Sequence, residues 1–403
     1  MLVPVISEAQ LSAPGMSTVR YTSYPSAPTV KDPIFIYCND SGSQKGSLNA
    51  SSPGGTGPFN FSWYKWSDAT KSFSIFLKSE TGVLTSAFGD LDEGGYKVIL
   101  TGGIDTNFVG WIFLDKPISK ANLLNANCDY VAGKGLAAID TFYYNNISNG
   151  VPVKLPNGVH FLWSSDPPST IPYPDFLLEW QTFDPPLVDV TYKLEVTDSF
   201  GCISESSFFY PTIRVKADFT AEPNTGQAPL IVSITDKSIR ATQYKWEFGD
   251  SLAASKIIKE TFSSESPVPD PHTYYIPGDY YLKLTVSGKC VDTMRIKISV
   301  DQSELHIPNV FTPNDDGFND NFIVESKSLR SLSMEVFSRS GLKVYSFFGY
   351  GEKLKNWKGW DGTINSSSAK ATPGVYYYLI KAYGWDDVNY DNKEYRGFVY
   401  LYR

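Results

Sequence analysis

The sequence predicts an all-β protein, built as tandem immunoglobulin-like (Ig-like) β-sandwich modules in a linear string. Aromatic residues, which favour strands, make up 15% of the 403 residues, with 26 Tyr and 25 Phe. The 31 Gly and 26 Pro supply turns between many short strands, a composition typical of sandwiches. A chain of this length exceeds what one hydrophobic core usually organises, so we expect several domains.

Charge and hydropathy argue against nucleic-acid binding and against a transmembrane segment. Charged residues are only 19% of the chain and the formal net charge is −8, with a pI near 5.1. Nucleic-acid binding requires basic patches, so no nucleic-acid partner is expected. No apolar run is as long as a membrane span, and the chain is expected to have no transmembrane segment of its own.

Residues 1–30 are predicted to be a signal remnant or an N-terminal arm. The apolar residues 2–6 precede Ser7, Glu8 and Ala9, which resemble the small-residue cleavage site of a signal peptide. No charged region and no full apolar region come before them. The two interpretations, a truncated signal peptide and an ordinary arm, both remain open.

Residues 31–118 and 119–212 are each predicted to form an Ig-like module. Both carry a strand with Trp followed by a strand with Tyr, namely Trp63 with Tyr96 and Trp163 with Tyr192. The first module reads GGTGPFNFSW at 54–63 and LDEGGYKVIL at 91–100, which resembles repeats of Bacteroidetes surface adhesins. Its Gly-rich stretch lacks the strand and helix context of a phosphate loop.

Residues 213–301 are predicted to form the third module. The segments APLIV at 228–232, WEFGD at 246–250, HTY at 272–274 and PGDY at 277–280 together resemble the PKD (polycystic kidney disease) domain. Trp246 and Phe248 are two apart, so both should point to one face of a strand. His272 is interpreted as a packing residue, because the other two histidines, His160 and His306, lie in other modules.

Residues 302–403 are predicted to form the fourth module. Apolar Leu332, Met334 and Val336 alternate with other residues, as in a strand, and a second strand follows the turn at 338–341 to complete a hairpin. A run of β-favouring residues from Val375 to Ala382 predicts another strand.

Four sequence blocks of this module occur in a fixed order. They are NVFTPNDDGFND at 309–320, WDGT at 360–363, PGVYYY at 373–378 and RGFVY at 396–400. This order resembles the type B C-terminal sorting domain of the Bacteroidetes type IX secretion system, also called the gliding-motility-associated C-terminal domain. The resemblance implies export through the type IX translocon to the cell surface or the extracellular space. The hairpin turn departs from the family, with Ser340 where an aromatic residue is usual, while Gly341 keeps the glycine that the turn needs.

The family also implies a partner, a PorP/SprF-type outer-membrane barrel that retains the exported chain on the surface. The final strand is expected to be an exposed edge with Tyr400 and Tyr402 on one face, open to strand addition by the partner. The alternative is that this strand only completes the sandwich.

The four cysteines are expected to include one disulfide. An exported chain can form disulfides, and Cys128 and Cys202 lie in one module, so we predict that they pair. Cys38 and Cys290 have no evident partner in their own modules. No cysteine spacing resembles a zinc site.

Two further sites are considered. The Asn/Asp cluster at 314–320 is interpreted as a loop of side chain-to-backbone turns, with a calcium site as the alternative; no other cofactor is expected. The tripeptide at Asp292, Thr293 and Met294 matches the pattern on which Bacteroidetes place O-glycans, which makes Thr293 a candidate glycosylation site.

No catalytic motif is present in the sequence, and paired acids such as Asp386 and Asp387 fall in predicted turns. We therefore expect a non-enzymatic exported surface protein. One hypothesis makes it an accessory of the secretion or gliding apparatus, bound to the barrel. The alternative is a secreted or surface adhesin that binds glycans.

Overall fold

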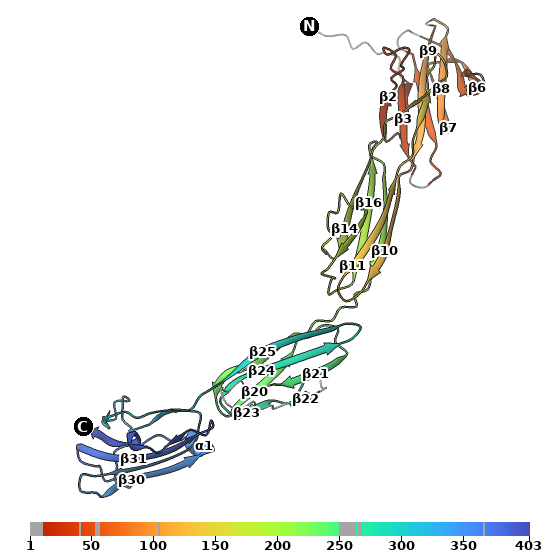
Figure 1. Ribbon diagram of the computed structural model, residues 1–403. Helices are drawn as coiled ribbons and strands as arrows, with labels where there is room; N and C mark the ends of the chain where they lie inside the picture. The colour runs from red at the N-terminus through yellow and green to blue at the C-terminus, as the bar shows by residue number, and fades with distance from the viewer. Residues whose placement is uncertain are drawn as a thin grey trace, which may run out of the picture. The chain divides into compact units, whose positions relative to one another are not determined.

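A computed structural model describes residues 11–39, 42–52, 57–103, 105–249, 263–264, 268–365 and 367–403. The predicted cleavage site at 7–9, part of the Gly-rich stretch at 54–57 and the end of the third-module motif at Asp250 lie outside the described residues. The described chain confirms the all-β class, since strands dominate it (Figure 1). It divides into two compact units, residues 1–212 and 213–403.

The first module, residues 11–115, is a sandwich of two sheets with strand orders β1-β4-β7 and β2-β3-β9-β8-β5-β6. Its strands are β1 Leu11–Ser12, β2 Thr18–Tyr21, β3 Pro33–Cys38, β4 Gly46–Ser51, β5 Phe59–Ser67, β6 Ser72–Val83, β7 Thr85–Leu91, β8 Gly94–Thr101 and β9 Thr106–Asp115. Trp63 and Phe61 on β5 are fully buried because alternate residues of a strand face the core. From Leu11 onward the predicted arm belongs to this module, since β1 pairs with β4 and β2 with β3.

The second module, residues 118–210, has two three-stranded sheets, β10-β11-β15 and β14-β16-β17, and a separate hairpin, β12-β13. Its strands are β10 Ile118–Ala126, β11 Val131–Ala138, β12 Tyr143–Asn145, β13 Pro152–Lys154, β14 Val159–Asp166, β15 Glu179–Thr182, β16 Val190–Asp198 and β17 Ile203–Tyr210. Trp163, Trp180 and Tyr192 form its aromatic core. The hairpin residues instead pack onto the first module.

The third module, residues 219–301, packs the sheet β18-β20-β23 against the sheet β19-β25-β24-β21-β22. Its strands are β18 Phe219–Glu222, β19 Thr225–Gln227, β20 Leu230–Asp236, β21 Gln243–Phe248, β22 Ser263–Ser264, β23 His272–Tyr274, β24 Gly278–Ser287 and β25 Val291–Asp301. Trp246 and Phe248 are both fully buried on β21, as their spacing predicts. The His272 ring lies 4.6 Å from the Phe248 ring, centroid to centroid, in agreement with a packing role.

The fourth module, residues 304–401, contains the sheet β27-β33-β31-β29-β30, with β32 paired to β31, and a small sheet β26-β28. Its elements are β26 Glu304–His306, β27 Val310–Phe311, β28 Glu325–Lys327, β29 Leu329–Phe337, β30 Lys343–Tyr350, α1 Gly351–Lys355, β31 Gly374–Gly384, β32 Asn389–Tyr390, the 3-10 helix η1 Lys393–Tyr395 and β33 Arg396–Leu401. The predicted hairpin is confirmed, because β29 pairs with β30 across a turn in which Gly341 has a φ of +82°.

Candidate functional sites at the C-terminal sheet and the module junctions

The loop at 314–320 is organised by the Asp320 carboxylate. Its Oδ1 accepts hydrogen bonds from the backbone N–H groups of Asn314 (3.0 Å) and Asp315 (2.7 Å), and its Oδ2 accepts one from Gly317 (2.8 Å). Burial opposes ionisation of Asp320, but these N–H donors outweigh it and lower the pKa of the carboxyl. The carboxylate therefore holds the loop's own backbone, which supports the interpretation as a turn structure. The alternative calcium site here stays a prediction.

All four sequence blocks contribute to the one core that contains Trp360. The Trp360 ring lies 5.2 Å from that of Phe311 in the first block and 5.1 Å from that of Tyr376 in the third, centroid to centroid. Its Nε1 donates to the carbonyl of Thr363 at 2.7 Å, which satisfies the one polar atom of a fully buried side chain. The aromatic residues of these blocks therefore have a packing role in the fourth module.

Arg403 ties the end of the fourth module to two of these blocks. Its guanidinium donates to the carbonyl oxygens of Ala371 (2.8 Å), Gly362 (3.1 Å) and Pro313 (3.4 Å). Three carbonyls from separate loops are therefore held by one planar cation, a geometry that Lys does not reproduce.

The final strand β33 is not the open edge that the sequence led us to expect. Its inner side pairs with β31, and on its outer side Tyr400 N donates to Asn309 O (2.8 Å) and Tyr402 N to Phe311 O (3.1 Å). The prediction of strand addition at β33 is therefore wrong at these residues, because β27 already uses their backbone donors. The outermost strands of this sheet are β27 and β30.

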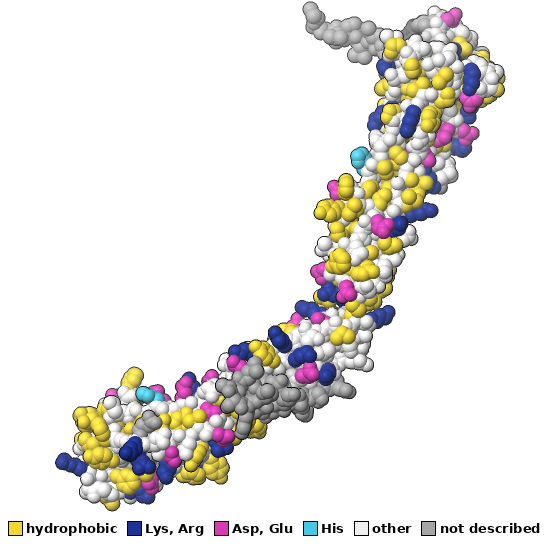
Figure 2. Space-filling view, viewed as in Figure 1, with side chains coloured by type: hydrophobic (Ala, Val, Ile, Leu, Met, Phe, Trp, Pro, Cys, Tyr) yellow, Lys and Arg dark blue, Asp and Glu magenta, His cyan; other side chains and the backbone are white. Residues whose placement is uncertain are grey.

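The side chains of β33 alternate between core and solvent. Val399 and Leu401 are buried, whereas Tyr400 is 38% and Tyr402 56% exposed. Residues from the neighbouring strands, paired with β33, extend this exposed surface. We call it the aromatic face, and its members are Val310, Tyr377, Phe398, Tyr400 and Tyr402. Figure 2 shows hydrophobic side chains on the visible surface of this module.

Thr293, the candidate glycosylation site, lies on β25 with its side chain exposed. Its Oγ1 is 3.4 Å from the Oγ1 of Thr285 on the neighbouring strand β24. The preceding Asp292 accepts a hydrogen bond from the backbone N–H of Ala217 at 2.8 Å. The Thr293 hydroxyl is thus reachable from solvent, and its modification stays a prediction.

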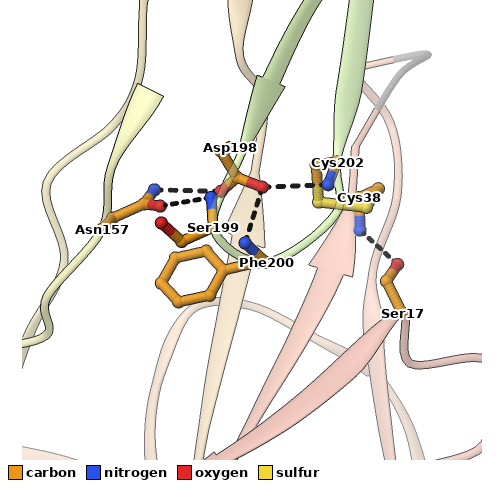
Figure 3. The surroundings of a disulfide bond; sticks show 7 residues. All are labelled: Ser17, Cys38, Asn157, Asp198, Ser199, Phe200 and Cys202. Carbon is orange, nitrogen blue, oxygen red and sulfur yellow. Dashed lines mark hydrogen bonds between the residues drawn. A yellow bond between two sulfur atoms is a disulfide. The ribbon is translucent and has the colours of Figure 1, made fainter. Parts of the chain in front are cut away.

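The disulfide of Cys202 differs from the predicted one. Cys202 is bonded to Cys38 of the first module, with the two Cα atoms 5.2 Å apart, and not to Cys128 (Figure 3). The predicted Cys128–Cys202 pair is wrong because the turn after β16 brings Cys202 to the end of β3. Closing a loop with a sequence separation of 164 residues is worth about 5 kcal/mol in the chain-entropy model.

Asp198 builds the turn that positions Cys202. Its Oδ1 accepts hydrogen bonds from the backbone N–H groups of Phe200 and Cys202, both at 2.9 Å, and its Oδ2 accepts one from Asn157 Nδ2 at 2.9 Å (Figure 3). Asn157 Oδ1 in turn accepts the N–H of Ser199 at 3.1 Å. The buried Asp198 carboxylate thus fixes the backbone of this turn through hydrogen bonds. This role is not among the sequence-based predictions.

The contacts between the first and second modules, which we call the first junction, are largely apolar. The ring of Phe142 lies 4.8 Å from that of Phe113, and the ring of Tyr144 lies 6.1 Å from that of Trp111. These residues form one buried cluster with further side chains from both modules. The first junction is thus a continuous hydrophobic core, closed by the Cys38–Cys202 bond.

The contacts between the third and fourth modules, the second junction, centre on buried Ser328. Its Oγ donates to Asp301 O at 2.7 Å and accepts a hydrogen bond from Ala228 N at 2.9 Å. Beside it the rings of Tyr275 and Trp385 lie 5.6 Å apart, centroid to centroid. A groove of about 650 Å³ runs between the modules, lined by residues 227–229, 323–326, 329, 351, 352, 354, 355, 357 and 385.

No helix among the described residues is both long enough and apolar enough to cross a membrane.

The comparisons with known proteins identify one part of the chain. Residues 305–401 match the family model described as CHU_C Type IX secretion signal domain. The search among curated proteins found no match. The match at 305–401 confirms the sorting domain expected over 302–403, and with it export by the type IX system to the cell surface or beyond.

Three solved structures are among those that match this chain. A solution NMR structure from Methanosarcina mazei is 30% identical over 23% of this chain, which spans 57% of that protein's length, with a TM-score of 0.19. A tetra-tandem repeat from the extending region of a large adhesion protein is 11% identical, with 98% and 99% of the two chains covered and a TM-score of 0.25. The human desmocollin-1 ectodomain is 10% identical, with 88% and 76% covered and a TM-score of 0.21.

Proposed function

We propose that this exported protein is a non-enzymatic accessory of the secretion or gliding apparatus, retained at the cell surface by a PorP/SprF-type outer-membrane barrel. The observation that carries the proposal is the aromatic face, which lies on the same module as the type IX signal. Exposed contiguous apolar surface of this kind marks interaction sites on soluble domains. Aromatic residues also carry a large share of binding energy in protein interfaces.

The aromatic face binds through side chains and not through backbone pairing. Tyr400 and Tyr402 already donate their N–H groups to Asn309 and Phe311, so a partner reaches the rings and hydroxyls. The rings of Tyr400 and Tyr402 stack at 5.9 Å, and that of Phe398 lies edge-on to Tyr400 at 5.5 Å. Such a preformed cluster loses little side-chain freedom on binding.

The test replaces Tyr400 and Tyr402 together by Ser in the full chain. Retention on the cell surface and the melting temperature are both measured. The proposal predicts release of the exported protein into the medium with an unchanged melting temperature. Loss of both properties would instead assign the two tyrosines to the stability of the sandwich, and normal retention with normal stability would reject the face as the docking surface.

A matched control uses exposed aromatic residues elsewhere on the same sheet. Phe348 and Tyr350 on β30 are 57% and 66% exposed and lie outside the aromatic face. Their replacement by Ser should leave retention unchanged. Release of this control variant as well would show that loss of any surface aromatic residue is enough, which argues against a specific barrel contact.

The third module, as a spacer domain of PKD type, is consistent with the proposed non-enzymatic role. Its Trp246, Phe248, Tyr274 and Tyr280 all point into one core, so the residues of the PKD-like pattern serve packing. The three histidines of the chain lie in three different modules. These placements favour a structural passenger over an enzyme.

An adhesin that binds glycans is the second candidate, favoured by exposed aromatic residues in the second module. Tyr173, Phe176 and Phe183, between β14 and β16, are 70%, 78% and 77% exposed. Sugar rings can stack on flat exposed aromatic rings. Aromatic residues are also enriched at binding surfaces in general. Replacing Tyr173 and Phe176 by Ser in the full chain should reduce binding to a glycan array if this candidate holds. Unchanged binding, or no binding by the parent protein, rejects it.

A further inference from the structure

Two carboxyl groups are buried side by side at the first junction. Asp115, the last residue of β9, is fully buried, and Asp198, the last residue of β16, is 3% exposed. One carboxylate oxygen of each and the Sγ of Cys202 lie within 4.8 Å of one another. Among the described residues, neither oxygen of Asp115 has a hydrogen-bond partner. A buried carboxylate without donors is strongly unfavourable, so its charge needs compensation from another source.

The described residues around this pair provide no compensating cation. Neither Asp115 nor Asp198 takes part in any of the ion pairs found in the described chain. Burial, the adjacent Asp198 and then Asp140 raise the pKa of Asp115 to about 8, and the nearby backbone N–H of Lys116 lowers it by less. Burial and Asp140 also raise the pKa of Glu93, which accepts the N–H of Leu114 at 2.9 Å. The buried surroundings and the nearby acids therefore make the charged form of Asp115 unfavourable unless a cation lies beside it.

We propose that Asp115 and Asp198 hold a divalent cation, Ca²⁺ by preference, between the first and second modules. Within the described part of the chain, Asp115 offers two oxygens without hydrogen bonds, and Asp198 Oδ2 accepts one bond, from Asn157, which leaves a lone pair. The sulfur of Cys202 is bonded to Cys38, so no thiolate is available for a soft metal. An all-oxygen site suits Ca²⁺ or Mg²⁺, and Ca²⁺ accepts an irregular set of ligands whereas Mg²⁺ demands near-ideal octahedral geometry.

The cation would link the two modules through their own strands. Asp115 belongs to β9 of the first module and Asp198 to β16 of the second, so each module contributes one ligand. Because Asp198 also organises the turn that carries Cys202, the cation and the disulfide act on the same short segment. Ca²⁺ would thus fix the first junction in addition to the covalent bond.

A shared proton is the competing explanation, and one substitution separates the two. If Asp115 is protonated and donates to Asp198, the amide of Asp115→Asn can donate in its place and the fold keeps its stability. A neutral amide does not replace a carboxylate in a site for a divalent cation, because it removes the charge that holds the ion. The variant therefore preserves the proton-sharing contact and abolishes the cation site.

The experiment uses the full chain, stripped with EDTA and titrated with Ca²⁺ and, in parallel, with Mg²⁺. Calorimetry should find about one Ca²⁺ per chain. At a concentration about 100-fold above Kd the melting temperature should rise by roughly 5 to 10 °C. The Asp115→Asn variant should lose both effects. Absence of Ca²⁺ binding by the parent protein, or the same response in Asp115→Asn, overturns the proposal.

Two further variants keep the result interpretable. Asp316→Asn alters the loop at 314–320, the other acidic cluster, and should keep the full Ca²⁺ response; loss of the response there places the ion in the loop and overturns the proposal. Asp140→Asn removes an exposed acid near Asp115 and should weaken Ca²⁺ affinity several-fold with normal folding. If Asp115→Asn fails to fold, an unchanged affinity in Asp140→Asn counts against the site.

Discussion

The two junctions of this protein differ in the kind of contact that holds their modules together. The first joins its modules through a shared apolar core, in which Phe142 and Tyr144 pack on Phe113 and Trp111, and through a disulfide. The second joins its modules through hydrogen bonds to one buried serine, Ser328, and through Trp385, which packs at the margin of the third module's core, with a groove beside them.

The difference shows how much each junction should resist opening. An apolar core with a covalent closure loses several kcal/mol when one element is removed, whereas a hydrogen-bonded contact contributes about 1 kcal/mol per bond. The sorting domain is therefore joined to its neighbour by the weaker kind of contact. The first two modules, in contrast, should unfold as one cooperative body.

Removal of the Cys38–Cys202 disulfide should have the largest effect on stability. The double variant Cys38→Ser, Cys202→Ser should lose up to about 5 kcal/mol of unfolding free energy, because the closed loop spans 164 residues. Thermal and denaturant unfolding of the full chain would measure it. Non-reducing peptide mapping checks the pairing itself; a linked Cys128–Cys202 peptide would contradict the structure.

Truncation of the core of the first junction should follow in size. Phe142→Ala is expected to cost about 3 to 5 kcal/mol, since Phe142 is buried among aromatic side chains. The adjacent Tyr143 is 52% exposed, and Tyr143→Ala serves as the control with an effect within about 0.5 kcal/mol. Equal effects of the two variants on denaturant unfolding would show that the junction is not a shared core.

Ser328→Ala tests the second junction. The substitution leaves the buried N–H of Ala228 without its acceptor, so we expect a loss of about 1 to 3 kcal/mol in the unit 213–403. Ser368, which is exposed, provides the control Ser368→Ala with an effect near zero. Hydrogen exchange at the Ala228 N–H should accelerate in the Ser328 variant alone. Unchanged protection of that N–H would show that Ser328 does not hold the second junction together.

The smallest effect is expected for the ring contact at the second junction. Tyr275 is 50% exposed and its ring lies 5.6 Å from that of Trp385, so Tyr275→Ala should cost about 0.5 to 1.5 kcal/mol. A loss as large as that of Phe142→Ala would mean that both junctions rest on apolar packing, and the contrast between them would fail.

Much of this architecture follows from local patterns. Alternation along β16 places Tyr192, Leu194 and Val196 inside, and the spacing of Trp246 and Phe248 places both in the third core. Strand periodicity is a property of neighbouring residues, so it can be read without knowing the partner strand. The sorting-domain blocks were equally readable, since each residue type has a packing or turn role at its own position.

Two of the wrong predictions concern residues that are distant in sequence. The Cys38–Cys202 pair crosses a module boundary, and nothing in the spacing of four cysteines distinguishes it from a pair within one module. Coverage of β33 by β27 depends on two residues about 90 positions upstream. One signal was overlooked: the alternation along β16 continues to Asp198, which already indicated a carboxylate facing inward.

We conclude that residues 302–403 are the secretion signal and that the remaining modules are exported with it. The most direct measurement is protease accessibility on intact cells that produce the chain without residues 302–403. We expect a protein that is trapped in the periplasm and protected, whereas the chain without residues 31–212 still reaches the surface through its intact sorting domain. Surface exposure of the chain that lacks 302–403 would contradict the account.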